Sequence, residues 1–579
     1  MYRQEYERWI NSIYLSEPEI EELKAFTDEK EIEYRFGKDL EFGTAGMRGI
    51  MGLGTNMMNV YTVRRATQGL AEYILSLGRK QAERGVVISY DTRLNSDVFA
   101  RAAANVLSFN GIKVYLFSDV HPVPMLSFAV RELNAVAGIM ITASHNPKEY
   151  NGYKVYGEDG AQMSPENTAK VVRYMEGIDL LAVRDGQALD KAPEAAREQV
   201  HAAPVRKLGR SLDRKYYKAI GKLTLSRAAV KKVGKKIGLV YTPVNGSGYV
   251  PVTTILKKLG IKVTVVEEQA GKDPSFSTVE VPNPEFKETL ELAIRRANKI
   301  KADVVFGTDP DCDRLGVAVR DGAGEFVALS GNQVGALLLD YILRRLKKED
   351  RLPVHGLVVK SFVSTGLAKA ICEDYGVELA ETPVGFKFIG EKIKECEESG
   401  EKEFLFGFEE SCGYLCGTHC RDKDAVVASM LFAEMVCYYT FKGETVWGRL
   451  MRLYEKYGYT LDRTSSIAFG GLNAMEEMNA VVDKLKSEQV RSFDIYGVAA
   501  VRDYSVPVRR LADGREEAID ITPSNTVYYE LENGSFLCVR PSGTEPKLKV
   551  YYSIRAKDAQ AAEKAYSKLK NAFETLLKN

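Results

Sequence analysis

Residues 86–119 read VVISYDTRLNSDVFARAAANVLSFNGIKVYLFSD. This stretch combines a β-branched apolar run, a polar loop, a segment with helical periodicity, a glycine and a second apolar run. The same order of features recurs in residues 237–269 and 355–383. A strand–helix–strand crossover of this length predicts parallel strands, and the wide spacing of the copies favours three related α/β domains over a solenoid. The glycines at the predicted helix ends, where a left-handed residue is common, are Gly111, Gly260 and Gly376.

The end of the chain has a different pattern. Residues 526–543 and 547–558 read as antiparallel strands, and residues 559–579 have the periodicity of a long amphipathic helix. This order predicts a separate C-terminal α+β domain. We therefore expect an α/β fold of three tandem, related α/β domains with mixed sheets, followed by that fourth domain. The predicted domain boundaries are 1–210, 211–325, 326–450 and 451–579.

The length and composition are those of an ordinary globular protein with several domains. A chain of 579 residues is too long for one hydrophobic core, and a formal net charge of +1 gives no general attraction to nucleic acid or anionic membranes. The charged N-terminus lacks the apolar segment of a signal peptide, and no run is long enough to span a membrane. All eight cysteines lie at or after Cys312, without a regular disulfide framework. We expect free thiols and a cytoplasmic protein.

A predicted strand over residues 135–142 ends in an unusual run of small polar residues, TASHNP. One interpretation is a turn, since Asn-Pro is turn chemistry. The other is that the strand brings Ser144 to the edge where open α/β sheets bind ligands. His145 and Lys154 are neighbours that could assist its hydroxyl, which is a poor nucleophile alone. The acyl-enzyme motif G-x-S-x-G is absent here, and this stretch alone leaves both interpretations open.

A second polar cluster follows the apolar run of residues 304–308. Asp309, Asp311 and Asp313 alternate, and on an extended backbone they would point to one side. Three carboxylates in one place repel each other unless a hard divalent cation lies among them. An EF-hand is excluded, because arginines stand where that loop needs glycine and glutamate. The arginine that follows, Arg314, indicates that an anion such as phosphate shares the site; a solvated loop is the alternative.

Two glycine-containing loops have donors suited to a phosphate. Residues 42–49, FGTAGMRG, allow backbone N–H groups to approach an anion beside Arg48. A turn between two predicted strands offers a second set of donors, namely Arg540, Ser542, Gly543 and Thr544. Each loop could also be an ordinary surface turn.

Residues 406–426, FGFEESCGYLCGTHCRDKDAV, combine several functional side chains. Glu409 and Ser411 suit sugar hydroxyls, and Lys423 is a candidate proton shuttle if a cationic neighbour lowers its pKa. Zinc ligation is one interpretation of the cysteines, but their spacing matches no C-x2-C pair, so buried free thiols are favoured. These cysteines, which lie beside His419, are Cys412, Cys416 and Cys420.

Four motifs, one in each expected domain, resemble those of a single family. In chain order they are TASHNP (142–147), DPDCDR (309–314), GFEESCG (407–413) and RPSGTEP (540–546). They resemble the motifs of the α-D-phosphohexomutases, and the similarity covers nearly the whole chain. Three further stretches are most similar to the longer branch, which includes bacterial phosphoglucomutases and phosphopentomutase-like enzymes: YTPVNGSG (241–248), RDKDAV (421–426) and YEKYGY (454–459).

The resemblance implies four domains around a central cleft and a phosphoserine at Ser144. It implies that Mg²⁺ is bound by that phosphate and by Asp309, Asp311 and Asp313. The serine would pass its phosphate to a hexose phosphate, and the resulting glucose 1,6-bisphosphate, which also serves as activator, would turn round and return its other phosphate. The expected reaction is the interconversion of glucose 1-phosphate and glucose 6-phosphate. Mannose or pentose phosphates as substrates, or a metal-dependent sugar-phosphate phosphatase, are the alternatives.

The resemblance also implies roles for single residues. His145, Lys154 and Lys423 match positions near the transferring proton, and Arg48 would neutralise charge beside the cation. The residues expected to bind substrate are Thr44, Arg48, Arg314, Gly385, Glu409, Ser411, Lys423, Arg540, Ser542, Gly543 and Thr544.

Two positions depart from the family pattern. Val384 stands where glucose-specific relatives often have threonine, and Cys412 separates Ser411 from Gly413. The first departure weakens glucose as the sole substrate; the second has no explanation in the sequence. The expected partner is a small sugar phosphate bound by a monomer, with no nucleic acid and no membrane.

Overall fold

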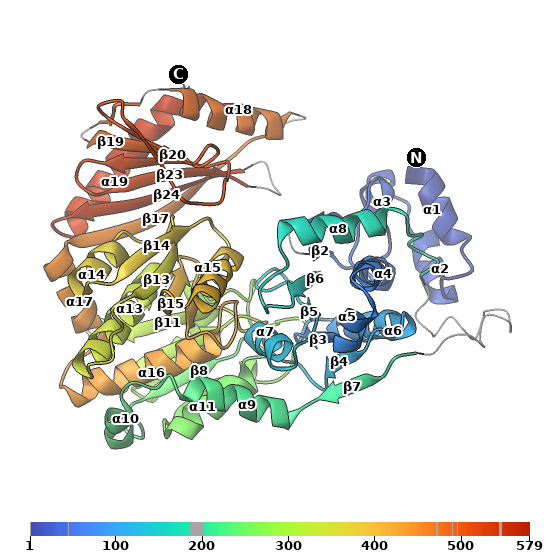
Figure 1. Ribbon diagram of the computed structural model, residues 1–579, viewed down its shortest axis with the longest axis horizontal. Coiled ribbons are helices and arrows are strands. Elements are labelled where there is room, and N and C mark those ends of the chain that lie inside the picture. Colours follow the sequence, from blue (N-terminus) through green and yellow to red (C-terminus); the bar gives the residue numbers. More distant parts are fainter. Residues whose placement is uncertain are drawn as a thin grey trace.

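The computed structural model describes residues 2–43, 46–183, 202–470, 473–488, 490–494, 496–542 and 547–578. Four separate sheets follow one another along the chain. In Figure 1 the first domain, in blue, and the C-terminal domain, in red, stand on opposite sides of the view, and the second and third domains connect them.

The first sheet is mixed, with strand order β1-β2-β6-β5-β3-β4-β7. Its strands are β1 (Phe42–Gly43), β2 (Gly46–Ile50), β3 (Val86–Tyr90), β4 (Val114–Phe117), β5 (Ala137–Ile141), β6 (Tyr150–Gly157) and β7 (Val205–Leu208). The helices of this part are α1 (Tyr2–Ile10), α2 (Glu17–Lys24), α3 (Glu29–Phe36), α4 (Val60–Ser76), α5 (Arg79–Arg84), α6 (Ser96–Phe109), α7 (Val123–Glu132) and α8 (Pro165–Glu176).

The second and third sheets have the orders β12-β11-β10-β8-β9 and β14-β13-β15-β16. The second is built from β8 (Leu239–Thr242), β9 (Val263–Val265), β10 (Val304–Thr308), β11 (Leu315–Arg320) and β12 (Phe326–Leu329), with helices α9 (Arg210–Gly221), α10 (Arg227–Val233), α11 (Tyr249–Leu259), η3 (Glu267–Gln269) and α12 (Lys287–Lys299). The third is built from β13 (Gly356–Ser361), β14 (Glu378–Thr382), β15 (Glu403–Glu409) and β16 (Gly413–Cys416), with helices α13 (Gly331–Lys348), α14 (Leu367–Tyr375), α15 (Phe386–Ser399), α16 (Ala425–Phe441) and α17 (Val446–Tyr457).

The C-terminal sheet is antiparallel, in the order β17-β24-β23-β22-β19-β20-β21, and β18 pairs with β19. Its strands are β17 (Tyr459–Ala468), β18 (Ser492–Phe493), β19 (Tyr496–Asp503), β20 (Val508–Leu511), β21 (Glu516–Ala518), β22 (Val527–Leu531), β23 (Phe536–Pro541) and β24 (Lys547–Ala556). Two helices, α18 (Ala474–Ser487) and α19 (Ala559–Lys578), complete the domain.

The three repeated stretches form the units that the sequence predicts. In each, a strand, a helix and a second strand lie in order, and the two strands are parallel: β3 with β4, β8 with β9, and β13 with β14. The glycine after each helix is left-handed, with φ of 73° at Gly111, 89° at Gly260 and 68° at Gly376. Three related α/β domains with mixed sheets and a C-terminal α+β domain are thus confirmed.

Helix α16 packs into an apolar core that the first three domains share. Its residues from Ala425 to Tyr439 are buried, and its apolar side chains join one core cluster with apolar side chains from the first and second domains. Among the described residues no single helix is long and apolar enough to cross a membrane; α16 and α17 meet that test only as a pair, bent by 87°. All eight cysteines are free and buried.

Glu434 on α16 is a buried carboxylate that links two domains. It is fully buried and accepts hydrogen bonds from the backbone N–H groups of Leu225, at 3.0 Å, and Ser226, just before α10. Burial raises the pKa of Glu434 from 4.5 to about 7. The folded state therefore holds a proton that the unfolded chain has already lost between these two pH values, so this group makes the fold less stable as pH rises through that window.

We expect Glu434→Gln to remove this part of the pH dependence. The pKa shift corresponds to about 3 kcal/mol between the two limits. The wild type should therefore have the higher melting temperature at pH 4.5. This difference in melting temperature between wild type and variant should shrink as the pH rises to 7.5. Melting temperatures measured for both proteins across this range check the prediction, because the other titrating groups are the same in both. A difference in melting temperature that is constant with pH would contradict it.

Candidate active site

A cleft of about 590 Å³ lies between the first three domains. Among the residues that line it are Arg48, Ser144, His145, Lys154, Asp313, Arg314 and Lys423. The structure therefore brings together predicted site residues from three different domains.

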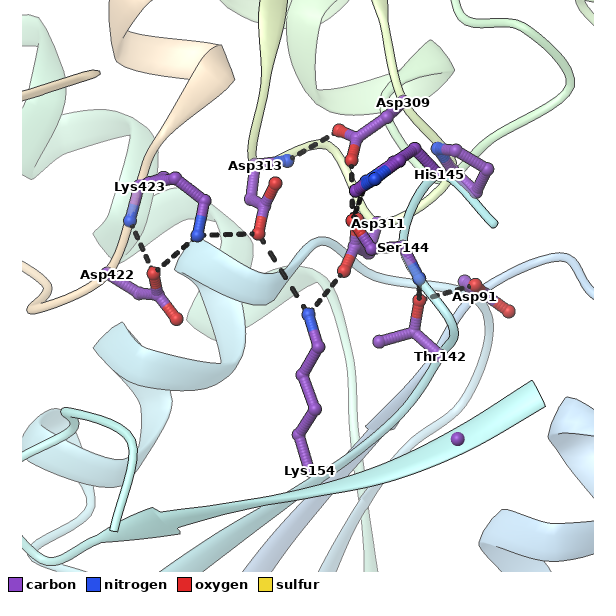
Figure 2. Close-up of polar contacts among 12 residues, drawn as sticks. Asp91, Thr142, Ser144, His145, Lys154, Asp309, Asp311, Asp313, Asp422 and Lys423 are labelled. Carbon is purple, nitrogen blue, oxygen red and sulfur yellow. Dashed lines mark hydrogen bonds and ion pairs between the residues drawn. The ribbon is translucent and has the colours of Figure 1, made fainter. Parts of the chain in front are cut away.

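Ser144 lies just beyond the end of β5, as expected, but its backbone is not that of an ordinary turn residue. It is left-handed, with φ of 52°, and its N–H donates to Thr142 Oγ1 at 2.8 Å. The side-chain Oγ lies 3.0 Å from Asp309 Oδ2 and 3.1 Å from His145 Nδ1. The left-handed conformation is unfavourable for a residue other than glycine. In this conformation the Ser144 hydroxyl faces the carboxylate cluster (Figure 2).

The three aspartates converge, although not in the way that the sequence suggested. The extended backbone expected for residues 309–313 is wrong: the segment is a turn, in which Cys312 N–H donates to the Asp309 carbonyl at 2.9 Å and Cys312 is left-handed. The turn places one oxygen of each carboxylate within 4.8 Å of the others. Asp311 Oδ1 and Asp313 Oδ1 are buried without a hydrogen-bond partner. Buried, unpaired carboxylate oxygens are suited to a divalent cation.

Two lysines approach the cluster from different domains (Figure 2). Lys154 on β6 lies 2.8 Å from Asp311 Oδ2, and Lys423, just before α16, lies 3.1 Å from Asp313 Oδ2. Burial acts to lower the pKa of Lys423, but Asp313 and Asp422 outweigh it and hold that pKa above its ordinary value. The condition for a proton shuttle, a pKa lowered by a cation, is not met, so Lys423 remains an ammonium group.

The pKa of His145 is shifted in the opposite direction to that of Lys423. Burial, together with Arg314 and Arg48, lowers its pKa to about 2, so the imidazole is neutral at neutral pH. Arg48 itself donates from Nη1 to Asn146 Oδ1 at 2.9 Å, and Arg314 is paired with Glu285. These contacts bring both arginines to the rim of the serine loop and the carboxylate turn.

The expected sugar-binding residues Gly385, Glu409 and Ser411 belong to the third domain and are not among the residues that line the cleft. Glu409 at the end of β15 is buried and accepts the Gly385 N–H at 2.7 Å, and burial raises its pKa to about 7. Ser411 lies in the following turn. Cys412 is left-handed, with φ of 62°, and its carbonyl accepts the Leu315 N–H at 3.0 Å. This bond fastens the turn to β11, directly after the carboxylates. These backbone features do not require a cysteine, and the structure does not explain this residue.

Other expected residues are not joined to the cleft. Arg540 and Ser542 of the C-terminal domain are not among its lining residues. Arg540 donates to Tyr551 Oη at 3.3 Å, while its Nε is buried without a hydrogen-bond partner. Thr44, Gly543 and Thr544 lie outside the described residues. Val384 packs against an apolar cluster that joins the third and fourth domains and contains Phe362 and Tyr504.

Sequence reasoning missed Tyr156 and Asp422. The Tyr156 hydroxyl donates to Asp422 Oδ2 at 2.8 Å, and Asp422 Oδ1 lies 3.2 Å from Lys423 Nζ. Tyr156 is two residues after Lys154 on β6, so the two side chains share a face of the strand. That spacing was a signal in the sequence, but the partner lies 266 residues away.

A second possible metal cluster comprises His419, Cys420 and Asp424. Its oxygens are already engaged: Asp424 accepts the N–H groups of Val426 and Val427 at the start of α16, and also the Tyr216 hydroxyl. His419 Nε2 lies 2.7 Å from the same carboxylate. Asp424 is thus the N-cap of α16, and the three side chains are held together by hydrogen bonds. Cys420 is a buried free thiol, as the sequence favoured.

Four family models match the chain in succession. They describe phosphoglucomutase/phosphomannomutase alpha/beta/alpha domains I, II and III, at residues 39–182, 214–322 and 330–457, and the C-terminal domain, at residues 477–566. The chain is 36% identical over 528 residues to the phosphoglucomutase of Staphylococcus haemolyticus, covering 90% of this chain and 91% of the relative. It is also 36% identical over 535 residues to that of Staphylococcus aureus, covering 92% of each.

Solved structures agree at the level of the fold. A putative phosphomannomutase from Thermus thermophilus aligns with a TM-score of 0.65 at 23% identity, over 92% of this chain and 99% of the other. The phosphoglucomutase parafusin from Paramecium, in an open form, aligns with a TM-score of 0.68 at 17% identity, over 92% and 94%.

Three repeated α/β domains, a C-terminal α+β domain and a cleft with clustered carboxylates define a four-domain α/β enzyme. The chain belongs to the phosphoglucomutase/phosphomannomutase family. The resemblance to the α-D-phosphohexomutases is thereby confirmed.

We expect the carboxylate cluster to bind a divalent cation directly. Asp311→Asn should weaken the affinity for Mn²⁺ by about 10-fold or more, because it removes one of three negative charges from the turn. Titration of the metal-free protein with Mn²⁺, followed by electron paramagnetic resonance, measures this affinity without any reaction. The matched control is Asp350→Asn, an exposed aspartate after α13. Equal affinities in Asp311→Asn and the wild type would rule out the site.

Proposed function

We propose that the chain is an α-phosphoglucomutase, which interconverts glucose 1-phosphate and glucose 6-phosphate through a phosphoserine at Ser144. The observation that carries the proposal is the placement of Ser144 Oγ, 3.0 Å from Asp309 within a cluster of three buried carboxylates. Relatives named phosphoglucomutase are 36% identical over nine-tenths of the chain and support glucose as the sugar.

In this proposal Asp309, Asp311 and Asp313 would hold Mg²⁺ together with a phosphate oxygen on Ser144. The cation would neutralise charge on the transferring phosphoryl group. Their unpaired oxygens, Asp311 Oδ1 and Asp313 Oδ1, fit this role. Lys154 and Lys423 would supply further positive charge from the sides, each through an ammonium group already paired with the cluster.

The reaction would then be two phosphoryl transfers with one serine. The bond between phosphorus and Ser144 Oγ would break as a sugar hydroxyl oxygen bonds to phosphorus, and the proton lost by that hydroxyl would be taken up at Ser144 Oγ, which restores the serine hydroxyl. Neutral His145, 3.1 Å from Oγ, is placed to hydrogen-bond the serine oxygen. The product, glucose 1,6-bisphosphate, would reverse its orientation and return its other phosphate to Ser144; this compound would also restore enzyme that has lost its phosphate.

Binding both orientations of one sugar requires groups that accept either end. We assign the sugar hydroxyls to Gly385, Glu409 and Ser411, and the transferring phosphate to Thr44, Arg48 and Arg314. The distal phosphate is assigned to Arg540, Ser542, Gly543 and Thr544. Since Arg540 has an unpaired, buried Nε outside the cleft, we propose that the C-terminal domain closes over the substrate and excludes water.

The broader expectations belong to the same proposal. The domains would run over 1–210, 211–325, 326–450 and 451–579, and the enzyme would be a cytoplasmic monomer without nucleic acid or membrane partners. The net charge of +1 supports this view of its partners.

We expect rapid isomerisation when the enzyme is given Mg²⁺, a trace of glucose 1,6-bisphosphate and glucose 1-phosphate. Phosphorus-31 NMR would show the 6-phosphate growing with almost no free phosphate. Mannose 1-phosphate and ribose 1-phosphate, measured in parallel, test the sugar preference left open by Val384. Conversion of only one of those esters would overturn the glucose assignment, and free phosphate in every sample would indicate a phosphatase.

Ser144→Ala should lower turnover by about 1,000-fold or more, because the phosphate carrier is lost. Binding of glucose 1-phosphate, measured by calorimetry, should change by no more than about 3-fold, since Ser144 is not among the residues assigned to the sugar or the distal phosphate. Turnover near the wild-type value would exclude a phosphoserine mechanism.

A further inference from the structure

Arg93 makes an unusual set of contacts beneath the serine loop. It follows β3 and is 3% exposed. Its guanidinium donates to four backbone carbonyl oxygens of the loop: from Nη2 to Ser144, at 2.6 Å, and to Asn146, and from Nη1 to Pro147, at 2.8 Å, and Tyr150, at 3.1 Å. The two terminal nitrogens of a guanidinium carry four N–H donors, one for each of these carbonyls, whereas a lysine ammonium has only three.

Asp91 connects this arginine to the other side of Ser144. Its carboxylate lies 3.4 Å from Arg93 Nε and accepts the Thr142 hydroxyl at 2.7 Å. Thr142 Oγ1 in turn accepts the Ser144 N–H at 2.8 Å. The N–H and the carbonyl of Ser144 are therefore both bonded to one buried network, which holds the residue in its left-handed conformation.

A turn with the same threonine contact occurs in the second domain, after β8, the strand that corresponds to β3 and not to β5. At the end of β8, Thr242 Oγ1 accepts the Val244 N–H at 3.1 Å, and Val244 is left-handed, with φ of 47°. The threonine contact is therefore not particular to the serine loop. The serine loop has in addition the four carbonyl contacts of Arg93 and the hydrogen bond from Arg48 to Asn146.

The second domain also touches the arginine directly. Phe276 is 1% exposed, and its ring centroid lies 5.0 Å from Arg93 Cζ. A guanidinium over an aromatic face, away from water, is a favourable cation–π contact. The support of the serine loop therefore includes a side chain from the domain that provides the three aspartates.

We propose that Arg93 is a positioning residue for phosphoryl transfer at Ser144. It holds the peptide on the carbonyl side of Ser144 so that Oγ faces Asp309, and Phe276 makes this alignment depend on the second domain. Arg93 touches none of the reacting atoms. The inference rests on the proposed function, because it assigns a role in the phosphorylation of Ser144.

The test measures how fast glucose 1,6-bisphosphate phosphorylates Ser144, by rapid quench and intact mass, together with kcat and KM. Arg93→Lys should slow phosphorylation and lower kcat by about 10- to 100-fold, with KM changed by less than about 3-fold, because misalignment affects the transfer more than binding. Thr142→Val, which keeps the shape but removes the acceptor of the Ser144 N–H, should slow phosphorylation by about 5-fold. Phe276→Leu should slow it by about 3-fold.

The matched control is Thr242→Val, the same substitution in the similar turn after β8 of the second domain, which should leave the phosphorylation rate and kcat at wild-type values. Wild-type rates in Arg93→Lys and Thr142→Val would overturn the inference. An equal loss in Thr242→Val would also overturn it, since the effect would then be general destabilisation. If Arg93→Lys does not fold by circular dichroism, Thr142→Val decides. A wild-type protein that acquires no phosphate would instead refute the proposed function.

Discussion

The structure depends on the neutralisation of three carboxylates that share one buried turn. Asp309, Asp311 and Asp313 are almost without solvent contact, and buried like charges are unfavourable unless cations lie among them. Part of the compensation comes from other domains: Lys154 from the first and Lys423 from the third. Burial acts to raise the pKa of Asp311, but Lys154 outweighs it and keeps that pKa below its usual value. Charge balance in the cleft therefore adds ionic contacts between three domains that also share an apolar core.

The sequence predicted the architecture because the repeated units have local signals. Strand, helix, left-handed glycine and second strand recur within about thirty residues, and the structure reproduces them at Gly111, Gly260 and Gly376. The convergence of the aspartates was predicted from a wrong geometry. Alternation on an extended strand and a turn around left-handed Cys312 both bring the carboxylates together, so the residue types pointed to a metal site although the backbone was misjudged.

The missed features are long-range contacts of side chains with backbone or with distant partners. No residue pattern indicates that Arg93 bonds carbonyls of a loop more than fifty residues later, or that Phe276 covers it. Lys423 was a candidate proton shuttle only on the condition of a lowered pKa, and the sequence gave no view of the carboxylates that raise it, Asp313 and Asp422. The carbonyl of Cys412 bonds to β11, a contact that no residue type in the motif indicates. Apart from the Arg93 bonds, which lie within the first domain, these contacts depend on the packing of one domain against another.

Strand β6 carries Lys154 and Tyr156 on one face, and the two side chains contact different domains, Lys154 through Asp311 and Tyr156 through Asp422. Successive residues of a strand point to opposite sides, so inserting or deleting one residue ahead of this pair would turn both side chains away together. The length of the strand therefore fixes where the first domain contacts the second and third domains. When chimaeras are built between relatives, we therefore expect an exchanged first domain to keep both contacts only if the length of β6 is preserved.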